Sequence, residues 1–206
     1  MGYITIKDFA EASFTEKHSE FIGYVKPVKT NDEAVEFINE IRARHRKATH
    51  NVYAYILRDG NISRYSDDGE PQGTAGIPVL EVLKKRGLTD ICCVVTRYFG
   101  GILLGGGGLV RAYSHSASLA VNSAQIMDMQ ECYRVFINSD YSLYGKINYV
   151  LPEFEIKLVN SDFGDSVTLE MLVKKAKMQA LSEKLTDLTN GKVNIEQSEE
   201  IFEDFG

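Results

Sequence analysis

Apolar and polar positions along the chain follow patterns that predict short strands and amphipathic helices. Residues 3–14 and 21–28 are rich in aromatic and β-branched side chains, which favours strands. Thr30 and Glu33 have the spacing of a capping box, in which the hydroxyl accepts the Glu33 amide and the glutamate reaches back. A helix is therefore predicted to about Arg46, with four apolar residues that continue at helical spacing: Ala34, Val35, Ile38 and Ile41.

The following segments predict a hairpin, a helix and a buried strand. Residues 52–57 and 62–66 have the composition of two strands joined by a turn. Pro78 is typical of the first residue of a helix, and Gly87 is typical of the position at which that helix ends. The continuous apolar run 91–96 is typical of a central strand that is buried on both faces.

The second half of the chain predicts a long helix and then a separate domain. Residues 109–124 predict the helix, and its Ala and Ser residues favour close packing. The rest follows the order βαββαβ, which is the split-βαβ or ferredoxin-like arrangement. Its predicted strands are 132–138, 156–160, 167–173 and 193–195, and its predicted helices are 142–150 and 177–188. We therefore expect an α+β protein with two domains, residues 1–128 and 129–206.

Composition is that of a soluble globular protein, with 44% hydrophobic and 25% charged residues. No apolar run is long enough to span a membrane, and the first residues lack the apolar core of a secretory signal. The net charge of −6 argues weakly against a general nucleic-acid-binding protein, but the acidic excess falls after residue 128, mostly in an acidic tail at 196–206. The three cysteines lack CxxC spacing, so we expect reduced, buried thiols in a cytoplasmic protein: Cys92, Cys93 and Cys132.

A glycine-rich segment, RYFGGILLGGGG at 97–108, is the first candidate for chemistry. Accessible backbone N–H groups before a helix N-terminus attract phosphate. Arg97 and Arg111 flank the segment and can bind phosphate, and Tyr98 and Phe99 can stack on a base. The spacing matches neither a Walker A loop nor GxGxxG. The alternative that the glycines only form a tight strand–helix junction therefore stays open. The candidate glycines are Gly100, Gly101, Gly105, Gly107 and Gly108.

The acidic loop DDGEPQGTAG, residues 67–76, is the second candidate. Asp67, Asp68 and Glu70 carry the oxygen ligands that Mg²⁺ prefers, but adjacent acids point apart, so at most two would reach one ion. Aspartates in turns also accept backbone N–H groups. We therefore expect a structural or partner-binding loop, which includes Thr74, and we predict no metal site and no cofactor.

Three further residues are candidates for a phosphate-binding surface: Lys47, His50 and Arg64. A solvated helix end and a hydrogen-bonded histidine are the structural alternatives, and both stay open. The four histidines show no metal-binding spacing, and the chain has no nucleophile elbow and no suggested Cys–His pair. We therefore name no catalytic residue.

Three stretches closely resemble the YigZ/IMPACT family. They are ATHNVYAY at 48–55, SDDGEPQGTAGIPVLEVL at 66–83 and VVTRYFGGILLGGGGLVRAY at 94–113. The resemblance covers about residues 14–124, and the βαββαβ segment resembles the small C-terminal domain of bacterial YigZ-type members. It implies an N-terminal domain like the second domain of ribosomal protein S5, which is shared with domain IV of elongation factor G and with the GHMP kinases. It also implies a C-terminal domain like the ferredoxin-like domains III and V of elongation factor G.

The resemblance implies a cytoplasmic protein that binds RNA, the ribosome or a translation factor and regulates translation. Its fold relatives act on RNA or the ribosome, and its eukaryotic members are linked to translational control through a protein partner. Analogy of fold suggests such a function without establishing it. Two alternatives stay open: an enzyme acting on a phosphorylated small molecule or nucleotide, and a protein-interaction module that uses the acidic tail. A binding role is favoured over an enzyme, and no membrane partner is expected.

Overall fold

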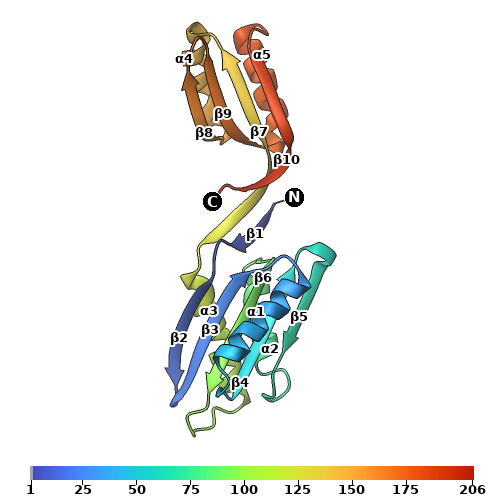
Figure 1. Cartoon of the computed structure of the whole chain (residues 1–206), viewed down its shortest axis with the longest axis vertical. Coiled ribbons are helices and arrows are strands. Elements are labelled where there is room, and N and C mark those ends of the chain that lie inside the picture. Colours follow the sequence, from blue (N-terminus) through green and yellow to red (C-terminus); the bar gives the residue numbers. More distant parts are fainter. Residues whose placement is uncertain (1) are drawn as a thin grey trace. The chain divides into compact units, whose positions relative to one another are not determined.

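The computed structural model describes residues 2–206, which form two compact units (Figure 1). One unit comprises residues 3–127, and the other comprises residues 128–206 together with Gly2. Antiparallel sheets and helices build both units, so the predicted α+β class is confirmed. Within residues 2–206, none of the helices has the length and apolar character needed to cross a membrane.

The N-terminal unit is built on a five-stranded antiparallel sheet. In spatial order its strands are β2 (Ala10–Glu16), β3 (Ser19–Pro27), β6 (Ile91–Tyr98), β4 (His50–Leu57) and β5 (Ile62–Ser66). The single strand predicted over residues 3–14 is wrong, because the chain bends at residues 7–9 and separates β1 (Tyr3–Ile6) from β2. A short 3₁₀ turn, Asp59–Asn61, joins β4 to β5.

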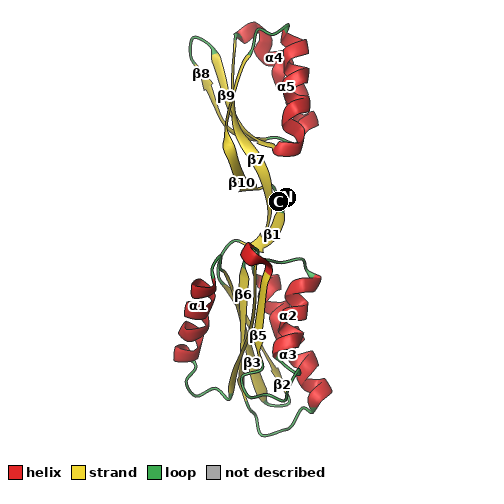
Figure 2. Ribbon diagram, turned by 90° about the vertical axis from the view of Figure 1, so that its right-hand side faces the viewer, coloured by secondary structure: helices red, strands yellow, loops and turns green. Residues whose placement is uncertain are grey.

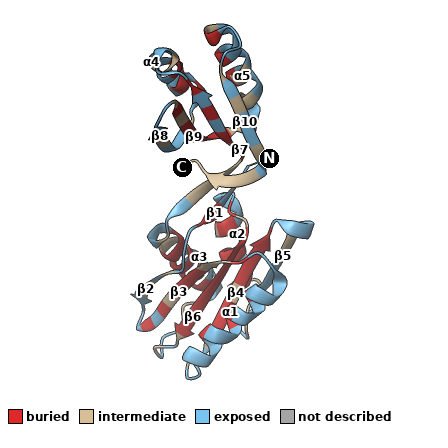
Figure 3. Ribbon diagram, turned by 45° about the horizontal axis from the view of Figure 1, so that its top comes forward, coloured by how far each residue is buried: buried red, intermediate tan, exposed pale blue. Residues whose placement is uncertain are grey.

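Helices cover both faces of this sheet (Figure 2). Helix α1 (Asn31–Arg44) lies on one face, and α2 (Gly76–Lys85) and α3 (Gly106–Ser123) lie on the other. Alternate residues of β6 serve the two cores: Cys92 and Val94 pack toward α1, whereas Cys93 and Val95 pack toward α2 and α3. The prediction of a central strand buried on both faces is confirmed, and Figure 3 shows β6 coloured as buried.

Helix α1 begins at the predicted cap, with one difference in the partner of the Glu33 carboxylate. The Thr30 hydroxyl accepts the Glu33 N–H at 3.2 Å, while the Glu33 carboxylate accepts the N–H of Lys29 rather than that of Thr30. Ala34, Phe37, Ile38 and Ile41 form the buried face of the helix, whereas Val35 is 43% exposed.

Two helices begin earlier than predicted. Helix α2 begins at Gly76, two residues before Pro78, because the Asp67 carboxylate accepts the N–H groups of Ala75 and Gly76. Helix α3 begins at Gly106 rather than at residue 109, so the last glycines of the glycine-rich segment are helical. The close packing predicted for α3 is confirmed at Gly23, where a Cβ would lie 2.6 Å from the Ser116 carbonyl oxygen.

The C-terminal unit has the predicted element order βαββαβ. Its elements are β7 (Ile126–Ser139), α4 (Tyr141–Val150), β8 (Lys157–Phe163), β9 (Val167–Lys174), α5 (Lys175–Thr189) and β10 (Asn194–Asp204), with a 3₁₀ turn at Leu151–Phe154. The strands lie in the order β10, β7, β9 and β8, and both helices pack on one face (Figure 2). The interpretation of residues 196–206 as a solvated tail is wrong, because residues 196–204 form most of β10 and pair with β7, and a docking role of this segment stays a prediction.

Candidate functional site

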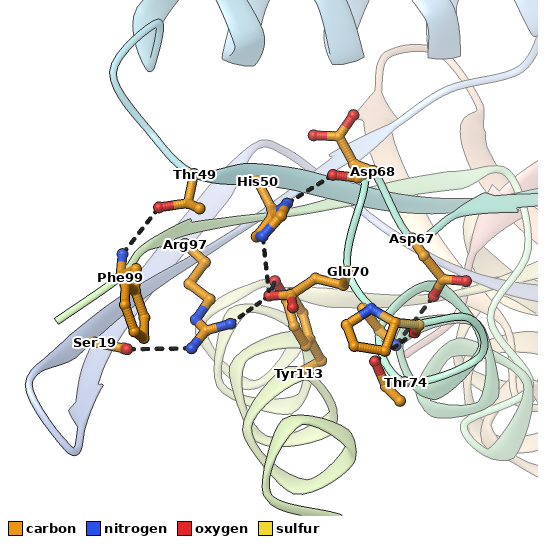
Figure 4. A network of polar contacts seen from close by, with 12 residues as sticks. Ser19, Thr49, His50, Asp67, Asp68, Glu70, Thr74, Arg97, Phe99 and Tyr113 are labelled. Atoms are coloured by element: carbon orange, nitrogen blue, oxygen red, sulfur yellow. Dashed lines mark hydrogen bonds and ion pairs between the residues drawn. The ribbon is translucent and has the colours of Figure 1, made fainter. Parts of the chain in front are cut away.

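The ends of three neighbouring strands meet at one end of the N-terminal sheet. His50 at the start of β4 and Phe21 near the start of β3 are both paired in register with Arg97, near the end of β6. Because side chains alternate along strands, these three residues share the face that α2 and α3 cover. Figure 4 shows how the acidic loop 67–76 brings Glu70 to this same place.

Glu70 lies at the centre of a buried polar network. Arg97 Nη1 and the Tyr113 hydroxyl donate hydrogen bonds to the same oxygen, Glu70 Oε1, at 2.6 and 2.7 Å. The side chains of Arg97 and Glu70 are only 6% and 3% exposed, and Tyr113 is fully buried. The arginine charge therefore compensates the carboxylate inside the unit, which is the condition under which buried charges are tolerated.

His50 is fixed in one orientation by the acidic loop. Its Nδ1 lies 2.7 Å from the Asp68 carbonyl oxygen, which can only accept, so Nδ1 carries the proton in this contact. In the neutral ring Nε2 is then an acceptor. Nε2 lies 3.7 Å from Glu70 Oε1, which is too long for a hydrogen bond. The neutral ring thus has a lone pair at Nε2 near Glu70, whereas a protonated ring would form an ion pair with Glu70.

The other acids of the loop are used to hold the loop itself. Asp67 accepts three backbone N–H groups through its two oxygens, from Gly73, Ala75 and Gly76. Asp68 accepts from the Asn51 N–H at 2.6 Å and from Arg42 at 2.8 Å. The Thr74 hydroxyl donates to the Pro71 carbonyl.

These contacts give the acidic loop a structural role. Within residues 2–206 no three metal-ligating side chains gather at one place.

A pocket of about 400 Å³ opens beside this network, and we call it the His50 pocket. Its polar wall is formed by His50, Glu70 and Arg97, and the first residues of α3 also line it. Its apolar wall consists of Phe99, Leu103, Leu104 and Leu109. The combination of an apolar wall with a few converging polar groups is typical of sites for small ligands, and the volume is within their usual range.

Sequence reasoning missed Tyr113 because it lies in a helix that was predicted only to pack. Burial and the neighbouring Glu70 carboxylate raise the pKa of Tyr113 above its ordinary value. A tyrosine on the buried face of a helix needs a partner for its hydroxyl, and this is the signal that could have linked α3 to an acid elsewhere.

The structure separates the residues of the predicted phosphate site. Arg97 is in the pocket, but Glu70 binds its guanidinium group. Tyr98 points to the opposite face, where its hydroxyl lies 2.9 Å from His45 Nδ1. Arg64 is exposed on the edge strand β5, opposite Tyr55 of the core that faces α1. These three side chains therefore cannot bind one phosphate together.

The candidate glycines also have different roles. Gly100 lies against the turn between β2 and β3, and a Cβ there would be 2.0 Å from the His18 carbonyl oxygen. Gly101 and Gly105 have positive φ angles of 85° and 68°, which favour glycine. Gly107 and Gly108 belong to the first turn of α3. The segment is therefore in part a close-packed junction and in part a helix start.

Arg111 and Lys47 remain on the surface. Arg111 lines a second cavity of about 280 Å³ together with Lys17, and Leu104 lines both this cavity and the His50 pocket. Within the described residues neither Arg111 nor Lys17 forms an ion pair. Lys47 is exposed and precedes Thr49, a lining residue of the His50 pocket, by two positions.

The fold and the pocket define a two-unit α+β protein with a ligand-sized pocket in a helix-covered antiparallel sheet. Two family models match these units: the Impact N-terminal domain over residues 17–121, and a domain of unknown function, DUF1949, over residues 137–192. The chain belongs to the IMPACT family, in its bacterial two-domain form of the YigZ/YvyE type.

Relatives match over nearly the whole chain. IMPACT family member YvyE of Bacillus subtilis is 43% identical over 199 residues, covering 96% of this chain and 92% of that protein. IMPACT family member YigZ of Escherichia coli is 34% identical over 187 residues, covering 89% and 92%. A solved structure described as that of a hypothetical protein matches with 31% identity and a TM-score of 0.61, covering 94% of this chain and 96% of its own.

Proposed function

We propose that this protein binds single-stranded RNA of the translation machinery through the surface around the His50 pocket. The observation that carries the proposal is a pair of cations, Lys17 and Arg111, which form no ion pair within the described residues and line a cavity that shares Leu104 with the His50 pocket. Leu104 separates the cations from the His50 pocket, in which the Phe99 ring is 44% exposed.

This surface has the two components that single-stranded nucleic acid requires. Phe99 is 44% exposed and offers a face on which a base can stack, while Lys17 and Arg111 attract the phosphates. Lys47 extends the positive charge on the side of Thr49. The net charge of −6 does not oppose this, because the acidic excess falls in the C-terminal unit.

The finer fold assignment supports the same function. The N-terminal unit is proposed to resemble the second domain of ribosomal protein S5 and domain IV of elongation factor G. The βαββαβ unit is proposed to resemble domains III and V of elongation factor G. Proteins with these domains act on RNA or the ribosome, which favours a cytoplasmic role in the regulation of translation.

The test is fluorescence polarisation of a labelled single-stranded RNA, repeated across a series of salt concentrations. The double variant Lys17→Ala/Arg111→Ala should bind more weakly, and its log–log salt slope should be smaller by about 1.4 if both cations contact phosphates. The matched control is Lys85→Ala/Arg86→Ala, which removes the same charge from exposed positions at the far end of α2. Equal affinities of the two double variants, or no binding at low salt, would overturn the proposal.

A further inference from the structure

We propose that the His50 pocket binds a guanine base. This inference goes beyond the proposed function, because it applies equally to the base of a free nucleotide and to an unstacked base in an RNA strand. It rests on the hydrogen-bonding atoms that the pocket presents, on their charge balance and on the apolar wall opposite them.

Two acceptor atoms without donors belong to this pocket. His50 Nδ1 is committed to the Asp68 carbonyl, so Nε2 of the neutral ring is an acceptor. Glu70 Oε1 receives Arg97 and Tyr113, whereas Glu70 Oε2 receives no hydrogen bond from the described residues. The Glu70 side chain lines the pocket and is 3% exposed, so this oxygen is available to a ligand that donates a hydrogen bond.

The charge balance excludes a strongly cationic ligand as the best occupant. The Arg97 guanidinium already lies 2.6 Å from Glu70, so the buried carboxylate is compensated before any ligand arrives. An ammonium or amidinium ligand would place a second positive charge next to Arg97. The pocket therefore favours a neutral group that carries two adjacent N–H donors.

Among the RNA bases, guanine alone has two adjacent donors on its Watson–Crick edge, N1–H and the N2 amino group. Adenine and cytosine place a ring-nitrogen acceptor next to their amino group, so one lone pair would face Glu70 or His50. Uracil offers one N–H between two carbonyl oxygens. A pair of acceptors thus selects guanine by the repulsion of the other three bases as well as by its own hydrogen bonds.

The remaining walls fit a planar ring. Phe99 and Leu103 are 44% and 81% exposed, and Leu104 and Leu109 continue the apolar wall. Gly106 lines the pocket at the N-terminus of α3, which has no side-chain cap, so its N–H is a donor for the guanine O6 oxygen.

The decisive measurement is isothermal titration calorimetry of the full chain with guanosine, inosine and adenosine 5′-monophosphates. The inosine nucleotide lacks only the N2 amino group, and its affinity should be lower by about tenfold or more. The adenosine nucleotide should bind more weakly still. Absence of binding of the guanosine nucleotide, or equal affinity for all three nucleotides, would overturn the inference.

Two variants connect binding to the proposed atoms. His50→Ala removes one acceptor and leaves the Arg97–Glu70 pair intact, and it should weaken binding of the guanosine nucleotide about tenfold. Glu70→Gln replaces the free oxygen by a donor and should abolish the preference over inosine, provided that thermal unfolding shows a folded protein. His18→Asn is the control, because His18 is exposed outside the pocket and Asn accepts its positive φ angle of 64°. Unchanged affinity in His50→Ala would contradict the inference.

A second arm separates the two sources of the base. An oligouridylate with one central guanine is compared with the same strand carrying inosine there. A preference for guanine in both the strand and the nucleotide supports an RNA site, and a preference in the nucleotide alone supports a free nucleotide. RNA binding that falls with salt but shows no base preference leaves the proposed function standing and overturns this inference.

Discussion

Arg97 and Glu70 form an ion pair of 2.6 Å in the interior of the N-terminal unit, although 27 positions separate them in the sequence. The arginine belongs to the central strand β6, and the glutamate belongs to the acidic loop. This pair attaches the loop to the sheet, and Tyr113 adds a contact from α3 to the same oxygen. A loop, a strand and a helix therefore depend on one carboxylate for their relative positions.

Removal of the arginine should strongly destabilise the protein. Arg97→Met would leave the Glu70 carboxylate buried without its cation, and we expect the free energy of unfolding to fall by about 3–5 kcal/mol. Urea unfolding of the full chain measures this change. In the control Arg134→Met, which breaks the more exposed Arg134–Glu170 pair, the change should be below about 1 kcal/mol.

The double variant Arg97→Met/Glu70→Met checks the reason for this loss. An apolar pair can fill the same space without an uncompensated charge, so the double variant should be more stable than Arg97→Met alone. A double variant that is less stable than the single one would mean that the Glu70 carboxylate stabilises the protein without Arg97, through its hydrogen bond from Tyr113.

Tyr113 should make stability dependent on alkaline pH. Burial and the Glu70 carboxylate raise the pKa of Tyr113 above its ordinary value near 10. The unfolded chain loses this proton near pH 10 while the folded protein keeps it, so the stabilisation is present below pH 10 and is lost above it. Tyr113→Phe should cost about 1.5–3 kcal/mol at pH 7, and the difference should shrink above pH 10. Unfolding curves between pH 8 and 11 test this, and a constant difference would contradict it.

Local patterns predicted the strands and helices well, because side-chain periodicity depends on neighbouring residues. The apolar run 91–96 predicted β6, and the βαββαβ order followed from similar patterns. The network around Glu70 could not be predicted this way. Its donors, Arg97 and Tyr113, lie 27 and 43 positions away, and nothing local to the loop distinguishes Glu70 from a solvated acid.

Composition predicted the wrong structure for two segments whose conformation depends on tertiary contacts. Residues 196–206 have the charge of a solvated tail, yet β7 supplies backbone partners that make residues 196–204 part of a strand. Gly107 and Gly108 have the composition of a loop, yet they lie in the first turn of α3. In both places the backbone follows a partner or a neighbouring element rather than the propensity of its own side chains.

The buried cysteines should be unreactive in the folded protein. Cys92 and Cys93 are free and fully buried, and burial raises the pKa of Cys93 to about 12. Because the thiolate is the reactive form, a thiol-specific reagent at pH 8 should label neither residue until denaturant is added. Ser13→Cys provides an exposed thiol on β2 as the positive control. Rapid labelling of Cys93 without denaturant, located by peptide mapping, would contradict the two-sided burial of β6.

Two alanine substitutions in the glycine-rich segment should act in opposite directions. A Cβ at Gly100 would lie 2.0 Å from the His18 carbonyl, so Gly100→Ala must displace backbone and should destabilise the protein by about 1–3 kcal/mol. A Cβ at Gly107 meets only Arg111 Nη1 at 3.7 Å, and alanine favours a helix, so Gly107→Ala should stabilise by about 0.5–1 kcal/mol. Chemical denaturation of both variants tests the division of the segment into a close-packed junction and a helix start. Equal losses of stability would mean that the segment acts as one loop.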